Sequence, residues 1–153
     1  MNNTCLSVVS HKQADIAGML LKDLDRVSTD LDVLFTSNVE EAWSAPANFR
    51  HQLKRITNTS AKGFSANHNQ AFKSCKSTTF CVANPDIRLA SDPFGDLLDA
   101  FQDPQVGVVA PLIVSPSGDH EDSARYFPTP LTLFNKARGS DDGRYPVDTT
   151  KTS

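Results

Sequence analysis

Apolar and polar positions alternate in blocks along most of the chain, and the spacing of the apolar positions changes from block to block. The segments 5–10 and 31–36 are short apolar runs, which predict two largely buried strands. Between them, apolar side chains recur at helical spacing, which predicts a helix with Asp15 as its N-cap. The expected buried stripe of that helix is Ile16, Met19, Leu20, Leu24 and Val27.

A second strand–helix–strand series follows. Residues 53–57 predict a third strand, and a helix is expected from Gly63 through Phe72. The apolar run 80–83 then predicts a buried strand that ends abruptly at Asn84.

The remaining pattern is weaker. Asp92 followed by Pro93 is a typical helix start, with proline at the first helical position. Residues 106–110 predict one more strand and residues 115–118 a turn, and after Pro130 the pattern fades into a polar end. The apolar stripe expected for the helix is Phe94, Leu97, Leu98 and Phe101.

This order of strands and helices, with short connections, predicts an α/β fold: a mostly parallel sheet with helices on both faces. The first strand–helix connection, residues 10–13, contains no GxGxxG pattern, so a dinucleotide-binding fingerprint is absent. A flavodoxin-like or receiver-type domain is the alternative α/β reading. It requires an acidic cluster after the first strand or a flavin-binding loop, and Ser10-His11-Lys12 offers neither.

Composition narrows the class of protein. The 153 residues suggest one domain, and 15 basic against 18 acidic residues with no basic tract argue against nucleic-acid binding. The longest apolar run, 106–114, is too short for a transmembrane segment, and no signal peptide is expected. Three cysteines without a CxxC pair predict reduced thiols and no zinc site. We therefore expect a cytoplasmic protein, free or at the inner face of the membrane.

Asp86 is the candidate for metal chemistry. It follows an apolar strand, at the end where open α/β sheets hold their ligands. One carboxylate there suits a divalent cation that bridges a diphosphate, because the phosphates complete the coordination shell. The alternative is that Asp86 caps a turn whose φ is fixed by Pro85. The residues alone leave both readings open.

Other candidates surround this position in the expected fold. Gly63 and Asn67 lie at a helix start, where free backbone N–H groups favour phosphate. The alternatives are a plain turn glycine at Gly63 and helix capping at Asn67. His11 and His68 are candidates for ligand contact or, alternatively, structural imidazoles with satisfied hydrogen bonds.

Five segments in order resemble family 2 glycosyltransferases with the GT-A fold, particularly the rhamnosyltransferase-like bacterial enzymes of polysaccharide synthesis. The resemblance implies a Rossmann-like, nucleotide-sugar-binding GT-A half-domain over residues 1–148, with a polar tail at 149–153. The matching segments are 7–11 (SVVSH), 63–69 (GFSANHN), 84–86 (NPD), 106–111 (VGVVAP) and 122–130 (DSARYFPTP).

The resemblance implies transfer of a sugar from a nucleotide-diphosphate sugar, such as dTDP-rhamnose, to a polysaccharide or lipid-linked acceptor. It also implies a divalent cation, Mg²⁺ or Mn²⁺. Asp86 matches the last carboxylate of the family's Asp-x-Asp metal signature, and Asn84 holds the first position. Ser10 and His11 match positions that border the nucleotide pocket, and Asn38 matches a position that contacts base or ribose. By the same resemblance Gly63 and Asn67 complete the expected donor-binding set.

The C-terminal part departs from the family. Relatives continue with a Trp-containing strand and an acidic motif that holds the general base, and no residue here matches that base. We therefore expect a C-terminally truncated chain without an acceptor half and assign no catalytic residue. Because the missing strand would separate 80–84 from 106–110, either these two segments pair directly or 106–110 packs loosely. The alternative function is a non-catalytic remnant or an interaction module, so enzymatic activity is left open.

Overall fold

The computed structural model describes residues 4–121 and 129–139. The chain divides into two compact units, Met1–Gly107 and Val108–Ser153, and each is described by itself. The matching segment 122–130 (except its last two residues) and the polar tail at 149–153 lie outside the described residues.

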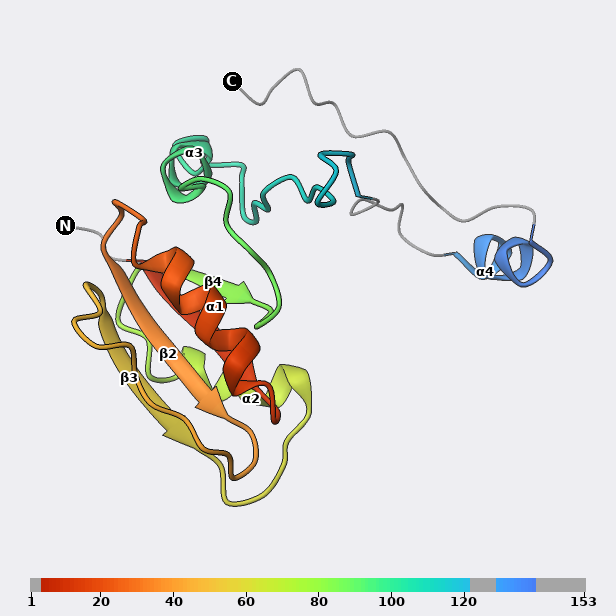
Figure 1. The fold of residues 1–153 in the computed structure, drawn as a ribbon. Helices are drawn as coiled ribbons and strands as arrows, with labels where there is room; N and C mark the ends of the chain where they lie inside the picture. The colour runs from red at the N-terminus through yellow and green to blue at the C-terminus, as the bar shows by residue number, and fades with distance from the viewer. Residues whose placement is uncertain (1–3, 122–128, 140–153) are drawn as a thin grey trace. The chain divides into compact units, whose positions relative to one another are not determined.

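The first unit contains a four-stranded sheet in the order β3-β2-β1-β4 (Figure 1). Its strands are β1 (Thr4–Ser10), β2 (Leu31–Ser37), β3 (Gln52–Thr57) and β4 (Thr79–Ala83). Every pairing is parallel. These four strands lie where the hydrophobic pattern predicts them, so the predicted α/β class is confirmed.

Helices cover both faces of this sheet, as predicted. Helix α1 (Ala14–Leu24) connects β1 to β2, and α2 (Phe64–Phe72) lies between β3 and β4 in the chain. Alternate residues of a strand face opposite sides. Accordingly, Leu6 packs in the cluster that contains α1, whereas its neighbour Cys5 packs with Ala71 of α2.

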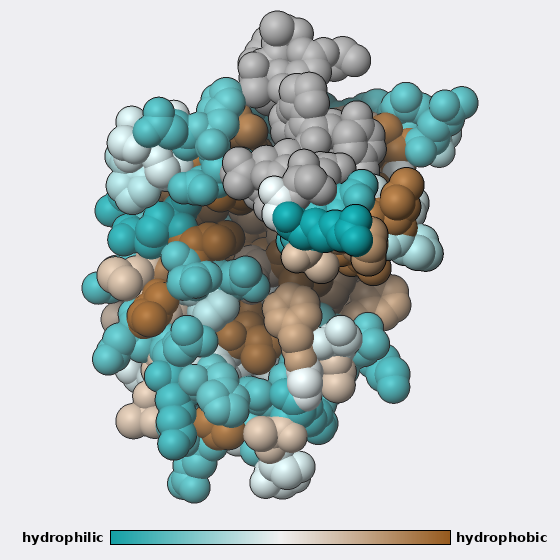
Figure 2. Space-filling view, turned by 90° about the vertical axis from the view of Figure 1, so that its right-hand side faces the viewer, coloured by the Kyte–Doolittle hydropathy of each residue, from teal (hydrophilic) through white to brown (hydrophobic). Residues whose placement is uncertain are grey.

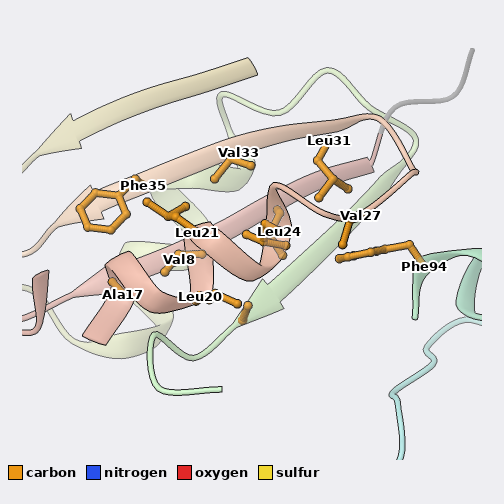
Figure 3. Packing of buried hydrophobic residues seen from close by; sticks show 12 residues of the cluster. Val8, Ala17, Leu20, Leu21, Leu24, Val27, Leu31, Val33, Phe35 and Phe94 are labelled. Atoms are coloured by element: carbon orange, nitrogen blue, oxygen red, sulfur yellow. The ribbon is translucent and has the colours of Figure 1, made fainter. Parts of the chain in front are cut away.

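The larger core lies between α1 and the sheet (Figure 3). Leu20, Leu21 and Leu24 of α1 point toward the strands that carry Val8 and Phe35. The cluster is completed from β2 and from α3 (Phe94–Ala100), which contributes Phe94. Each fully buried leucine or phenylalanine contributes about 1.5–3 kcal/mol relative to exposure, so this face holds most of the hydrophobic stabilisation.

The stripe and the cap predicted for α1 were partly wrong. Ile16 and Met19 are 36% and 41% exposed, whereas Ala17 and Leu21 are fully buried. The actual stripe is Ala17, Leu20, Leu21 and Leu24, an i, i+3, i+4, i+7 set. The helix begins one residue before Asp15, with Gln13 at the N-cap, whose backbone N–H donates to Ser10 Oγ at 3.2 Å.

The expectation that β4 is fully buried was wrong. β4 pairs only with β1 among the described residues, so it forms an edge of the sheet. Val82 on this strand is 47% exposed. An edge strand has a neighbouring strand on one side only, so its other side, with backbone N–H and C=O groups, is not covered by the sheet.

Helix α3 begins one residue later than predicted, because Pro93 is its N-cap rather than its first helical residue, and its apolar stripe is only partly buried. Asp92 Oδ1 accepts the Phe94 N–H at 3.0 Å, and Oδ2 accepts the Ser28 N–H at 2.8 Å. Phe94 is the buried residue of this helix, while Leu97 and Leu98 are half-buried. The carboxylate thus links the start of α3 to the loop between α1 and β2.

The strand predicted at 106–110 does not form, so this prediction was wrong. Val108 is 88% exposed, which agrees with the loosely packed alternative. In the second unit the predicted turn at 115–118 is confirmed: the Gly118 N–H donates to the Ser115 carbonyl at 2.9 Å, and Gly118 has φ +89°. A positive φ suits glycine, which lacks a Cβ.

Helix α4 (Pro130–Ala137) was not predicted. Its start has a clear local cause, because Thr129 Oγ1 accepts the Thr132 N–H at 3.1 Å while Thr132 Oγ1 accepts the Thr129 N–H at 2.7 Å. None of its residues is buried. Leu131, Leu133 and Phe134 are exposed on this helix, so among the described residues the local feature that favours it is its cap.

Hydrophobic side chains reach one face of the molecule among hydrophilic ones (Figure 2). In the first unit the large exposed apolar residues include Ile16, Met19, Phe64, Phe72 and Val82. The three cysteines are free, as expected. Across the described ranges, every helix is too short or too polar to cross a membrane.

Candidate functional site

A cleft of about 330 Å³ lies where β1, β2 and β4 end. The chain leaves β1 toward β2 and β3 on one side and returns to β4 on the other, so the strand order reverses between β1 and β4. Ligands of open α/β sheets bind outside the carboxyl ends of the strands at such a reversal. The polar residues that line this cleft include His11, Asn38, Asn67, His68, Asn84 and Asp86.

Five of the seven predicted donor-binding residues line the cleft, and Ser10 does not. Ser10 is buried, and its hydroxyl donates to Glu41 Oε2 at 2.8 Å. Its neighbour Val9 lines the cleft instead. The reason is the alternation of side chains along β1, which places adjacent residues on opposite faces. The expectation that Ser10 borders the pocket is therefore corrected.

Gly63 is the N-cap of α2 and is not itself part of the lining, although Lys62 and Phe64 are. Its φ of −68° is open to any residue, and a Cβ added there would meet no atom within 4 Å. Neither the backbone conformation nor close packing demands glycine here. The plain turn glycine thus remains the simpler reading of this position.

Three buried asparagines hold the loop that precedes α2. Asn58 follows β3, and its Nδ2 donates to Asn38 Oδ1 at 3.0 Å and to Asn67 Oδ1 at 2.7 Å. Asn67 Nδ2 in turn donates to the carbonyls of Lys62 and Gly63, each at 3.1 Å. Both amide hydrogens of Asn67 are therefore used in hydrogen bonds within the protein, and neither is free to bind a ligand.

Asn58 was not among the predicted site residues, although its position after a strand was a sequence signal. Asn38, Asn58 and Asn84 each follow directly on the last residue of a strand: β2, β3 and β4. The same residue type at three strand ends indicates loops that are tied to one another, because asparagine can both donate and accept.

The Asn38 side chain likewise forms all its hydrogen bonds within the protein. Its Oδ1 accepts the Lys62 N–H at 2.8 Å, and its Nδ2 donates to the Lys62 carbonyl and to His11 Nδ1, each at 3.0 Å. It is only 5% exposed. With both hydrogens and both acceptor positions used, a direct contact to base or ribose would require one of these bonds to break. The structure therefore shows Asn38 bonded to His11, Asn58 and Lys62.

His68 lies at the wall of the cleft and is 5% exposed. Its Nδ1 is hydrogen-bonded to Ser7 Oγ at 2.8 Å, and the ring packs edge-on against Phe64 with centroids 4.4 Å apart. Its Nε2 is buried and has no partner among the described residues. Burial lowers the pKa of His68, so the imidazole is neutral near pH 7.

Asp86 and Asn84 are exposed in the cleft, in contrast to the buried asparagines. In the described part of the chain no group donates a hydrogen bond to the Asp86 carboxylate, so the carboxylate does not cap the turn. Within the part of the chain that the structure describes, Asp86 and Lys62 are the only Asp, Glu, Lys or Arg side chains in the lining. The carboxylate is thus available to an external cation.

The donor set at Asp86 fits a cation that arrives with a diphosphate better than a resident metal ion. The described residues contain no group of three or more His, Cys, Asp or Glu that could hold a metal. One carboxylate, with the Asn84 amide oxygen nearby in sequence, is a hard-oxygen set of the kind that Mg²⁺ uses when phosphates fill the remaining positions.

Two other hollows lack these residues. One of about 820 Å³ lies between α1 and residues 42–46, and one of about 300 Å³ is lined by Cys5, Asp32 and Cys75. Neither contains a predicted site residue, and the second is lined by the first residues of β2 and β3 rather than by their carboxyl ends. The larger hollow is lined by residues of α1 and of the segment 42–46, and Asp86 is not part of its lining.

The parallel sheet, the helices on both faces and the cleft at the strand reversal define a Rossmann-like α/β fold that matches the glycosyltransferase fold. Among solved structures the chain is similar to S. aureus TarS, a GT-A glycosyltransferase, with a TM-score of 0.53 and 15% sequence identity. The match covers 67% of this chain, which spans only 20% of that protein. A likeness at this identity establishes the fold. No protein-family model and no curated protein matches the chain.

Proposed function

We propose that this chain is the donor-binding part of a family 2 glycosyltransferase and that its cleft binds a nucleotide-diphosphate sugar. The observation that carries the proposal is the exposed Asp86 carboxylate in a cleft at the point of strand reversal. The glycosyltransferase fold supports the same conclusion. Because one fold can serve many functions, the proposal depends mainly on the residues of the cleft.

In the proposed complex, Asp86 holds a divalent cation, Mg²⁺ or Mn²⁺, that is bound mainly by the diphosphate. The cation would neutralise the charge that develops on the leaving diphosphate. Asn84 would add an amide oxygen or order the turn. Asn38, Asn58 and Asn67 keep the loop before α2 in place, so the cleft is formed before the ligand arrives.

The finer proposal is a rhamnosyltransferase-like enzyme that uses dTDP-rhamnose and a polysaccharide or lipid-linked acceptor. It rests on the segments that resemble that branch, including asparagine in place of the first metal-signature carboxylate at Asn84. No catalytic base is assigned.

Calorimetric titration of the purified chain with dTDP and UDP, each with Mn²⁺, tests donor binding. Asp86→Asn should weaken cation-dependent binding about tenfold or more, because it removes the only carboxylate of the cleft. Asp99→Asn, at an exposed carboxylate on α3, is the matched control and should bind like the wild type. Equal affinity of wild type and Asp86→Asn with Mn²⁺ would sink the proposed metal role.

An interaction module is the second candidate function. It is favoured by the unpaired outer edge of β4 and by the exposed Val82 on that strand, because open edges pair readily with other chains. Turnover of a sugar nucleotide by the purified chain, lost in Asp86→Asn, would exclude it. Association of the chain without any nucleotide binding would favour it.

A further inference from the structure

The orientation of the Asn38 amide is fixed by the backbone of one residue, Lys62. The Lys62 N–H, which can only donate, lies 2.8 Å from Asn38 Oδ1. The Lys62 carbonyl, which can only accept, lies 3.0 Å from Asn38 Nδ2. Exchanging the amide oxygen and nitrogen would set two donors and two acceptors against each other. Asn38 Nδ2 must therefore lie on the side of the Lys62 carbonyl, as it does in the structure.

This orientation determines the tautomer of His11. Asn38 Nδ2 also lies 3.0 Å from His11 Nδ1, and an amide nitrogen can only donate. His11 Nδ1 must then accept with its lone pair. A neutral imidazole carries one hydrogen, so that hydrogen is on Nε2. An imidazolium would place an N–H against the amide N–H₂ and lose the bond.

We propose that Asn38 holds His11 as a hydrogen-bond donor for the nucleotide, with His11 Nε2–H donating to an oxygen acceptor of the bound ligand. This inference rests on the proposed function, whose cleft it describes further. Asn38 is the positioning residue and is buried, whereas His11 is exposed and lines the cleft. The acceptor is a phosphate oxygen or a carbonyl oxygen of the base.

The position of His11 in the sheet supports this role. Asn38 follows β2, His11 follows β1 and Asp86 follows β4, and these strands are neighbours in the order β2-β1-β4. His11 therefore stands between the residue that orients it and the proposed cation. A neutral donor at this place suits an oxygen-rich ligand without adding another charge.

His51 provides an internal reference for the tautomer of His11. His51 Nδ1 accepts the Leu31 N–H at 3.4 Å, and its Nε2 donates to the Leu24 carbonyl at 2.7 Å, so the backbone fixes its Nε2–H tautomer. His68 pairs with the Ser7 hydroxyl, which can donate or accept, so its tautomer is not fixed in this way.

Nitrogen-15 NMR of the imidazole rings tests the role of Asn38 in the free protein. At a pH where His51 is neutral, His11 should show the Nε2–H pattern of His51. In Asn38→Asp this pattern should disappear, because a carboxylate cannot donate and Nδ1 must then carry hydrogen to keep the contact. A wild-type His11 that carries its hydrogen on Nδ1, or that averages between tautomers, overturns the inference whatever the variant does.

Binding of UDP and dTDP with Mn²⁺ tests the role of His11. His11→Phe keeps an aromatic ring but has no donor, and it should bind about tenfold more weakly. His11→Gln keeps an N–H donor and should stay within about threefold of the wild type. The opposite ranking would mean that the ring packs against the ligand rather than donating to it, and would overturn the inference.

Two further titrations identify the acceptor. A loss in His11→Phe that appears with inorganic diphosphate as well as with UDP indicates a phosphate oxygen. A loss with UDP but not with diphosphate indicates the base carbonyl. If the wild type binds no nucleotide, the proposed function and the ligand half of this inference both fail, while the NMR result still decides whether Asn38 sets the tautomer.

Discussion

At the scale of single residues, asparagine side chains do more to build the cleft than the charged residues do. Asn58 bridges Asn38 and Asn67 and is itself buried. Most amide groups of this network are paired, and among the described residues Asn58 Oδ1 is the exception. An unpaired buried polar group costs about 1–3 kcal/mol, so the paired groups matter for stability. His11, which is exposed in the cleft, is bonded to this network through Asn38.

Removing the central amide should therefore cost stability. In Asn58→Ala, Asn67 Oδ1 loses the hydrogen bond from Asn58 Nδ2, and Asn38 Oδ1 loses one of its two donors within the described residues. We expect a loss of about 1–3 kcal/mol in the free energy of unfolding, measured by urea denaturation. Asn69→Ala, at an exposed position on α2, is the control and should change stability by less than about 0.5 kcal/mol. Equal effects of the two substitutions would contradict the network.

At the scale of elements, helix α1 and the central strands β1 and β2 carry the main core (Figure 3). The helix itself was predictable from its apolar spacing, but its exact stripe was not. A helix of this composition offers two overlapping apolar stripes, and the sheet buries the one that contains the small Ala17. Packing density favours a small residue where helix and strands approach closely.

Alanine substitutions in the two apolar stripes of α1 should differ in their effect on stability. Leu21→Ala removes a fully buried side chain and should reduce the free energy of unfolding by about 2–5 kcal/mol. Ile16→Ala, on the same helix but 36% exposed, should cost clearly less, about 1 kcal/mol or below. Thermal and urea denaturation of both variants measure the difference. A larger loss for Ile16→Ala would place the buried stripe where the sequence pattern first put it.

At the scale of the whole first unit, one ion pair joins segments that are far apart in the chain. Arg88, after β4, donates through Nη2 to Asp23 Oδ1 at 2.9 Å and through Nε to Oδ2, and the Leu89 N–H donates to Oδ2 at 3.2 Å. The Arg88 hydrogen bonds lower the pKa of Asp23 below its usual value. This contact ties the segment after β4, which includes the Asp86 turn, to α1.

This ion pair predicts a pH dependence of stability. Because the pKa of Asp23 is lower in the folded state, the pair stabilises the fold fully above the unfolded value of about 4, and the gain is lost as the pH falls toward the folded pKa. Asp23→Asn should therefore be less stable than the wild type at pH 7, with a difference that shrinks below about pH 4. Urea denaturation at several pH values measures this. A difference that stays constant with pH would argue against the ion pair.

The sequence by itself determined the class of the fold and the order of the elements in the first unit. Local hydrophobic spacing and turn residues act over a few neighbours, so strands, helices and the strand-end position of Asp86 could be predicted. The strand predicted at 106–110 shows the limit, because an apolar run becomes a strand only if another strand supplies hydrogen-bond partners.

Only the tertiary structure decided which side chains meet in the cleft. Ser10 and His11 are adjacent in sequence, yet one donates to Glu41 and the other faces the cleft. Asn58 and the tautomer of His11 depend on hydrogen bonds between residues about twenty or more positions apart. Such pairings are fixed by the packing of the sheet and its loops. The asparagines that follow three of the strands indicate that hydrogen bonds form there, but the sequence does not say which partners meet.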